Sequence, residues 1–294
     1  MRDMNKIGII GIGMLGNAVA LHLLDVGFQV TIFNRTKEKA IQLKENGATI
    51  ATSPKEVATK SELIIIIVKD ANAVKEISFE SNGITEGAHD GLIVADMSTI
   101  DPLESKQISE RFLKNNINKL DIPVMGGPNV AISGELVMMV SGDKKSFEQC
   151  RNILEKIANK IFFLVDNGAA HSIKLAMNLQ ITMLALALSE GIMLVEKTNI
   201  DPKKFLEILN STYFKTGMSK NKAFKMIDGK YDATFTLKNL KKDIDTMLSS
   251  ANSLELELPM LKKAKQVYDD AVNQGFGEID YTGIIAYMRK INKK

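Results

Sequence analysis

The sequence predicts an α/β protein in which a doubly wound parallel sheet is followed by an all-α domain, the two joined by a long helix. Apolar runs of strand length alternate with helical patterns over residues 1–165, as in a doubly wound sheet. Residues 166–294 carry helical patterns only. A chain of 294 residues is long enough for these two domains, and 45% of its residues are hydrophobic and can fill two cores.

Six strands are expected in the first domain, at residues 6–10, 28–33, 63–68, 91–95, 119–124 and 161–165. The third of these, LIIIIV, is apolar without alternation, which is typical of a parallel strand covered on both faces. Helical patterns are expected at 18–26, at 37–46, after Pro54, after Pro102 and from about Asp143. A glycine-rich loop is expected between the strand at 119–124 and the last of these helices.

The joining helix, at 168–195, is followed by helices expected at about 201–210, about 217–227, 236–251, 259–273 and 280–290. It is apolar on all sides and has no charge between Lys174 and Glu190, so every face is expected to be buried. Because the run is shorter than a membrane span and contains polar residues, we interpret it as a core helix of a soluble protein. Lys174 and Asn178 share one of its faces. This spacing alone leaves Lys174 as either a snorkelling end residue or a functional amine.

Charge and cysteine content argue against several classes of partner. The 38 basic and 35 acidic residues are interspersed and give a net charge of +3, which is too small to indicate a nucleic-acid partner. Cys150 is the only cysteine, and the three histidines match no zinc-ligand spacing, so neither an intramolecular disulfide nor a metal is expected. The amino terminus shows no secretory pattern. We therefore expect a cytoplasmic protein with no nucleic-acid, membrane or metal partner.

A glycine-rich turn follows the first expected strand and opens the first helix. Its residues form a G-x-G-x-x-G pattern: Gly11, Ile12, Gly13, Met14, Leu15 and Gly16. In this context the pattern is the fingerprint of a Rossmann dinucleotide-binding domain, because the glycines allow a tight turn and close approach of the backbone to a pyrophosphate. The phosphates then lie at the helix amino terminus, where free N–H groups favour anions.

The end of the second strand indicates which cofactor is used. NAD enzymes usually place an acidic residue there to hold the ribose hydroxyl, whereas this chain has Asn34, Arg35 and Thr36. A guanidinium and a hydroxyl can bind a 2′-phosphate, and Lys37 adds charge nearby. The sequence therefore favours NADP over NAD. The alternative is that Arg35 stacks on the adenine, which it could do with either cofactor.

Three further motifs follow in order along the chain. They are D-I-P-V-M-G-G at 121–127 with G-E-L at 134–136, the trio Gly168, Lys174 and Asn178, and F-T-L-K-N-L-K-K-D at 235–243. Together with the glycine turn, they resemble the β-hydroxyacid dehydrogenases, which include 3-hydroxyisobutyrate dehydrogenases and glyoxylate/succinic-semialdehyde reductases and are related to 6-phosphogluconate dehydrogenase. The resemblance covers nearly the whole chain.

The loop at 121–127 is the family's substrate loop, so the resemblance implies that Met125, Gly126 and Gly127 contact the substrate. Paired glycines leave backbone N–H groups free to hold a carboxylate. Met125 departs from the family pattern, because many members carry a serine there that touches the substrate. The other residues that the resemblance implies are Ser98 and His171 for the substrate, and Val68, Lys69 and Thr99 for the cofactor.

Hydride transfer to a carbonyl carbon leaves negative charge on the oxygen, which needs a proton or a positive charge. The resemblance implies that Lys174 donates that proton in reduction and accepts it in oxidation, and that Asn178 binds the same oxygen. It also implies that Lys242 reaches the cofactor or the substrate and that Phe235 shapes the pocket. A lysine on an exposed helix face remains the alternative for Lys242.

These inferences predict an NADP-dependent oxidoreductase that interconverts a short 3-hydroxy acid, or a related hydroxy acid, and its semialdehyde. The substrate is expected to be a small carboxylate, and the chain is expected to form a homodimer or homotetramer. An NAD-dependent 3-hydroxyisobutyrate dehydrogenase is the nearest alternative. A non-catalytic cofactor-binding scaffold and an imine reductase are further alternatives, and both would be expected to lack the lysine that stands at 174.

Overall fold

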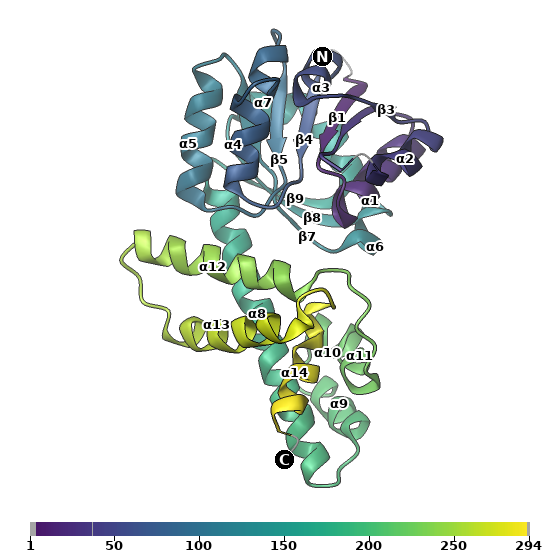
Figure 1. Ribbon diagram of the computed structural model, residues 1–294, viewed down its shortest axis with the longest axis vertical. Helices are drawn as coiled ribbons and strands as arrows, with labels where there is room; N and C mark the ends of the chain where they lie inside the picture. The colour runs from purple at the N-terminus through teal and green to yellow at the C-terminus, as the bar shows by residue number, and fades with distance from the viewer. Residues whose placement is uncertain (1–3, 37, 293–294) are drawn as a thin grey trace. The chain divides into compact units, whose positions relative to one another are not determined.

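An α/β unit and an all-helical unit make up the chain (Figure 1), in a computed structural model that describes residues 4–36 and 38–292. The chain divides into compact units at Met1–Lys174 and Leu175–Lys294. Strands and helices alternate through the first unit, and only helices follow in the second. This arrangement confirms the predicted fold class.

The sheet of the first unit is mostly parallel. Its strands are β1 (Lys6–Ile10), β2 (Gln29–Phe33), β3 (Thr49–Ile50), β4 (Leu63–Ile66), β5 (Ile93–Asp96), β6 (Asn118–Asp121), β7 (Val124–Met125), β8 (Leu136–Ser141) and β9 (Ala158–Leu164). They lie in the order β3-β2-β1-β4-β5-β6-β8-β7, with β9 paired to β8. The first six strands pair in parallel, with Ile9 beside both Ile32 and Ile65. Because β1 and β4 lie side by side, the turns that follow them meet at one edge of the sheet.

Strand β8 was not predicted, and it makes the sheet mixed rather than wholly parallel. It runs antiparallel to β6 and β7 and parallel to β9. Its sequence, LVMMVS, is almost fully buried and is flanked by Gly134 and Gly142, both with positive φ. A short apolar run between two glycines is a strand signal, but the glycines favoured the interpretation of the whole segment as a loop.

The helices of this unit cover both faces of the sheet. They are α1 (Met14–Asp25), α2 (Glu38–Glu45), α3 (Pro54–Lys60), α4 (Ala71–Phe79), η1 (Ile84–Gly87), α5 (Pro102–Leu113), α6 (Pro128–Ala131) and α7 (Lys144–Ile157). Helix α4 was not predicted, although Asp70 caps it by accepting a hydrogen bond from the Ala73 N–H at 2.9 Å. The helices that were predicted for this unit, α1, α2, α3, α5 and α7, lie close to their expected positions.

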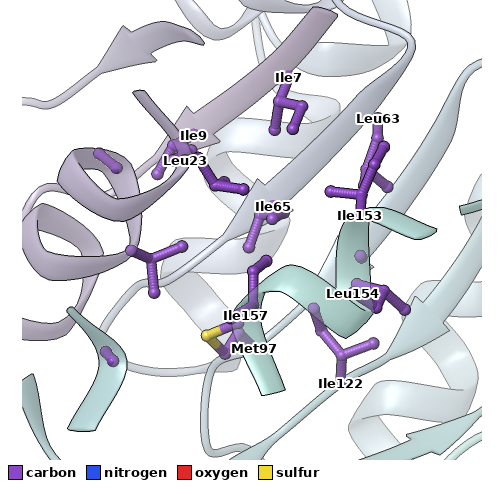
Figure 2. Close-up of a cluster of buried hydrophobic side chains, with 14 of the residues drawn as sticks. Ile7, Ile9, Leu23, Leu63, Ile65, Met97, Ile122, Ile153, Leu154 and Ile157 are labelled. Carbon is purple, nitrogen blue, oxygen red and sulfur yellow. The ribbon is translucent and has the colours of Figure 1, made fainter. Parts of the chain in front are cut away.

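Alternate residues of the central strands face two different cores. Figure 2 shows one of them, where Ile7 and Ile9 of β1 and Leu63 and Ile65 of β4 pack with side chains of α1 and α7. The opposite face of the same strands packs on α3, α4 and α5. Burial on both faces explains why LIII in β4 reads as a continuous apolar run.

The second unit is a set of helices around one apolar core. They are α8 (Ala169–Lys197), α9 (Pro202–Asn210), α10 (Gly217–Asn221), α11 (Ala223–Asp228), α12 (Leu237–Ser253), α13 (Pro259–Ala271), η2 (Val272–Phe276), η3 (Tyr281–Gly283) and α14 (Ile284–Ile291). The single helix expected at 217–227 is divided at Lys222 into α10 and α11. The other helices occur close to their predicted positions.

Helix α8 begins in the first unit and continues through the second. One face contributes Leu188 and Ile192 to the core of the helical unit. The prediction that every face is buried is wrong for this chain, because Ile173, Met177 and Leu194 are exposed. By length and composition alone α8 could cross a membrane, and 33% of its most apolar stretch is buried within the chain.

Candidate active site

Three glycines shape the turn between β1 and α1. Gly11 has a φ of +104°, and a Cβ there would lie 2.1 Å from the Ile67 carbonyl oxygen. A Cβ on Gly16 would lie 2.0 Å from the Gly11 carbonyl oxygen, so only glycine lets α1 approach the turn. Around Gly13, the N-cap of α1, there is open space and no capping side chain. A pyrophosphate fits this space, because the first N–H groups of the 12-residue helix lack a side-chain partner.

A cavity of about 850 Å³ adjoins this turn within the α/β unit. Its walls come from the glycine turn, the ends of β2 and β4 and the start of α4. The predicted cofactor residues that line it are Gly11, Ile12, Gly13, Asn34, Arg35, Thr36, Val68 and Lys69. Met14, Leu15, Gly16 and Thr99 do not line it. The size and the glycine turn suit a dinucleotide.

Asn34 holds the two cofactor segments together. Its Oδ1 accepts a hydrogen bond from the Ile12 N–H at 2.9 Å, and its Nδ2 donates to the Thr36 carbonyl oxygen at 2.7 Å. Both polar ends of the amide therefore have protein partners. Arg35 and Thr36 are exposed beside it, in reach of a ligand in the cavity. Lys37, predicted to add charge here, lies outside the described residues.

The residues at the ends of β4 and β5 are joined by a buried hydroxyl. Ser98 is 3% exposed, and its Oγ accepts a hydrogen bond from the Val68 N–H at 3.0 Å. The hydroxyl predicted to contact substrate therefore supports the cofactor loop. Lys69 is largely exposed and pairs with Asp70 at 3.1 Å.

Lys174 contacts the loop predicted to bind substrate, and both lie in the α/β unit. The Lys174 Nζ donates to the Val124 carbonyl oxygen at 2.8 Å and lies 3.4 Å from the Met125 Sδ. Val124 and Met125 form β7, and Gly126 follows with a φ of +122°. The half-buried ammonium is thus held beside the residues that precede the paired glycines. This places a proton donor next to a loop suited to a carboxylate.

A buried polar network anchors the start of α8 to this loop. Asp121, which ends β6, accepts hydrogen bonds from the Gly168 N–H at 2.6 Å and from the hydroxyls of Ser105 and Ser141 at 2.6 and 3.0 Å. Lys119 forms a buried ion pair with the same carboxylate. Burial favours the neutral acid, but Lys119 above all, with His171 and the Gly168 N–H, outweighs it and holds the pKa of Asp121 well below its usual range.

His171 belongs to this network. Its ring is fully buried, with Nε2 3.4 Å from the Asp121 Oδ1. The structure therefore places the residue predicted to bind substrate inside the protein, against Asp121. Sequence analysis did not single out Lys119 or Ser141. A polar residue within an otherwise apolar strand, as in Lys119-Leu120-Asp121, is the signal that could have identified them.

In the helical unit, Asn178 and the Lys242-Asp243 pair form a second polar cluster. The Asn178 Nδ2 donates to the Asp243 Oδ2 at 2.6 Å, and the Lys242 Nζ lies 2.5 Å from the Asp243 Oδ1. Lys242 is thus half-buried and ion-paired within its own unit, not on a fully exposed helix face. Phe235 packs against the Tyr281 ring at 6.0 Å. The contact between Asp243 and Asn178 was not predicted, although Asp243 ends the F-T-L-K-N-L-K-K-D motif.

No group of three metal-ligating side chains occurs over residues 4–36 and 38–292. The Lys174 ammonium places a positive charge beside the substrate loop. That arrangement can supply a proton to a developing alkoxide.

Two family models match consecutive parts of the chain. Residues 6–166 match the NAD-binding domain of 6-phosphogluconate dehydrogenase. Residues 168–288 match the NAD-binding domain of NADP-dependent 3-hydroxyisobutyrate dehydrogenase. The two matches meet just before α8.

Individual proteins resemble the chain over nearly its full length. Glyoxylate/succinic semialdehyde reductase 1 from Arabidopsis thaliana is 30% identical, over 97% of this chain and 98% of its own. A probable mitochondrial 3-hydroxyisobutyrate dehydrogenase from Dictyostelium discoideum is also 30% identical, over 97% of this chain and 91% of its own. The crystal structure of a 3-hydroxyisobutyrate dehydrogenase from Salmonella typhimurium superposes with a TM-score of 0.86 at 25% identity, covering 96% of this chain and 99% of that one.

Proposed function

Because this chain belongs to the β-hydroxyacid dehydrogenase family of NAD(P)-dependent oxidoreductases acting on CH–OH groups, we propose that it is an NADP-dependent enzyme that interconverts a short 3-hydroxy acid and its semialdehyde. The observation that carries this proposal is the Lys174 ammonium, hydrogen-bonded to the Val124 carbonyl oxygen next to Gly126 and Gly127. It combines a proton donor with a loop that suits a carboxylate. The similar Arabidopsis reductase and Dictyostelium dehydrogenase support this substrate class by their names.

The chain's own residues would divide the work of the reaction. A bound nicotinamide cofactor would supply the hydride in reduction and accept it in oxidation. Lys174 donates a proton to the substrate's carbonyl oxygen during reduction and takes it back during oxidation. Backbone N–H groups around Gly126 and Gly127 hold the substrate carboxylate and so fix the distance between that carboxylate and the reacting carbon. Asn178 adds a hydrogen bond to the same substrate oxygen without adding a charge.

Met125 narrows the range of substrates. Its Sδ lies 3.4 Å from the Lys174 Nζ, at the position where many family members have a serine. A thioether is a weak acceptor and cannot donate, so it offers little to a substrate hydroxyl beyond the reacting one. We therefore propose a short acid without additional hydroxyl groups.

A panel of four carbonyl or imine substrates tests the reaction class. We expect NADPH oxidation with glyoxylate, succinic semialdehyde or methylmalonate semialdehyde, and none with a cyclic imine. Following absorbance at 340 nm with each compound measures this directly. Turnover of the imine alone would indicate an imine reductase. No turnover of any compound, with NADPH still bound, would indicate a non-catalytic scaffold.

Replacing Arg35 with alanine tests the choice of cofactor. A guanidinium–phosphate hydrogen bond contributes about 1.5–3 kcal/mol, so NADPH should bind roughly 10- to 150-fold more weakly while NADH changes little. Fluorescence titration of both cofactors measures the two dissociation constants. Arg35→Lys keeps the charge without the planar fork and should fall between wild type and Arg35→Ala. Equal weakening of both cofactors would instead assign Arg35 to the adenine and support the NAD-dependent alternative.

Assembly and location remain predictions. A homodimer or homotetramer would cover the exposed apolar residues of α8, among them Met177 and Leu194. The cytoplasmic location and the expected lack of nucleic-acid and membrane partners rest on the sequence alone.

A further inference from the structure

Two carboxylates at the ends of neighbouring strands share one buried ammonium. Asp96 ends β5 and Asp121 ends β6, and the two residues lie side by side in the parallel register. The Lys119 Nζ forms an ion pair with Asp121 and lies 3.7 Å from the Asp96 Oδ2. All three side chains are fully buried. One buried cation therefore serves two buried anions, and the proposed reaction uses none of the three directly.

The carboxylate of Asp96 supports the cofactor loop (residues 67–70). Its Oδ1 accepts a hydrogen bond from the Ser98 N–H at 3.0 Å, and the Ser98 Oγ accepts one from the Val68 N–H at 3.0 Å. Val68 in turn lines the cofactor cavity. The Asp96 Oδ2 accepts no hydrogen bond within the part of the chain that the structure describes. Its stabilisation therefore comes from the positive charge of Lys119.

The carboxylate of Asp121 supports the start of the helix that carries Lys174. Its Oδ2 accepts hydrogen bonds from the Gly168 N–H at 2.6 Å and the Ser141 hydroxyl at 3.0 Å. The Ser141 Oγ accepts a further bond from the Ala170 N–H at 3.2 Å. Ala170 and Lys174 are four residues apart on α8 and share one of its faces. Asp121 thus determines where the helix that presents the ammonium begins.

The proposed reaction needs these two supports in a fixed relation. A hydride and a proton must reach the same carbonyl group, the hydride from a cofactor bound against the cofactor loop and the proton from Lys174. A displacement of about 1 Å can lower the rate of such a step by about 10²-fold. Without a cation between them, two ionised carboxylates on adjacent strand ends repel each other. With the Lys119 ammonium between them, moving either strand end separates opposite charges in surroundings of low dielectric constant.

We propose that Lys119 is a positioning residue that fixes the cofactor loop relative to the start of α8, and so fixes the hydride donor relative to the Lys174 ammonium. This inference rests on the proposed function and goes beyond it. Lys119 itself touches neither substrate nor cofactor in this assignment. Asp96, Lys119, Asp121 and Lys174 all belong to the α/β unit, so the link is complete within that unit.

Lys119→Met tests the assignment, because methionine has an unbranched side chain of similar length and no charge. We expect kcat to fall by about tenfold or more and the Kd for NADPH to rise by about threefold or more, because both supports are released. Lys75→Met is the matched control: Lys75 pairs with Glu104 at 2.7 Å in the same unit, is partly exposed and does not line the cofactor cavity. The control should stay within twofold of wild type. Wild-type kcat and Kd in Lys119→Met would overturn the proposal.

A variant of similar stability separates positioning from a general loss of stability. Leu23→Ala removes a fully buried side chain near the carboxyl end of α1, which does not line the cofactor cavity. We expect it to lower the melting temperature about as much as Lys119→Met does, while kcat and the Kd for NADPH stay within twofold of wild type. An equal loss of kcat in both variants would assign the effect to stability and overturn the proposal.

A double variant separates positioning from neutralisation of charge. Lys119→Met with Asp96→Asn removes one cation and one anion together, and the amide oxygen at 96 can still accept the Ser98 N–H. We expect the melting temperature to recover toward wild type while kcat stays low, because the ion pairs that join the two supports are gone. Recovery of kcat together with stability would show that Lys119 only balances charge. This variant also keeps the test available if Lys119→Met alone does not fold.

Amide hydrogen exchange at residues 168–172, the start of α8, provides a readout other than turnover. We expect NADP to slow exchange there in wild type and to slow it much less in Lys119→Met, because the link from the cofactor loop is broken. No slowing in wild type, or equal slowing in both proteins, would overturn the proposed link. Lys174→Ala is assayed in parallel: full activity there would refute the proposed function itself, whereas an inactive Lys174→Ala beside an unimpaired Lys119→Met would refute only the role of Lys119.

Discussion

Replacing Lys174 with alanine is expected to lower turnover about 10²- to 10⁴-fold, the range for loss of a general acid. The Lys174 Nζ contacts the Val124 carbonyl oxygen and the Met125 Sδ, and neither atom lines the cofactor cavity. The dissociation constant for NADPH should therefore remain nearly unchanged. Steady-state kinetics with the best substrate of the panel, together with a cofactor titration, measures both quantities.

A second substitution separates proton donation from charge. Lys174→Arg retains a positive charge, but a guanidinium with a pKa above about 12 does not release a proton at neutral pH. It should be nearly as impaired as Lys174→Ala. Wild-type turnover in Lys174→Arg would show that only electrostatic stabilisation is needed, and wild-type turnover in Lys174→Ala would refute the mechanism.

Much of the fold follows from local pattern. The apolar run in β4 and the G-x-G-x-x-G turn require a parallel sheet with a helix packed closely against it, and the structure has both. Strand β8 escaped prediction because its pairing with β6, β7 and β9 is a property of the sheet and not of the segment. Gly134 and Gly142, which flank it, resemble loop residues when only neighbours in sequence are considered.

The candidate site was predictable where motif spacing determines it. The contact of Lys174 with Val124 and Met125 joins two motifs whose order along the chain was already informative. The partners of Asp121 and Asn178 were not predictable, because hydrogen bonds across 47 and 65 residues depend on how strands and helices pack. Spacing likewise did not show that Ser98 and His171 are buried.

Replacing Asp121 with asparagine is expected to produce the largest loss of stability. The carboxylate is fully buried, forms an ion pair with Lys119 and accepts the Gly168 N–H. Removing one partner of a buried ion pair costs about 3–5 kcal/mol, because the other charge is left uncompensated. Urea denaturation at pH 7 measures the loss. Asp143→Asn is the control in the same unit: Asp143 is an exposed helix cap, and asparagine caps equally well, so its change should stay within about 0.5 kcal/mol.

The effect of Asp121→Asn should depend on pH in a definite direction. The pKa of Asp121 lies well below its usual range in the folded protein, so the unfolded chain binds the proton more readily. The stabilisation is therefore fully present above about pH 4, the ordinary aspartate pKa, and is lost as the pH falls toward the folded value. The difference in unfolding free energy between wild type and Asp121→Asn should accordingly shrink from pH 7 to pH 3. A difference that stays constant over this range would show that the charge of Asp121 does not contribute to stability.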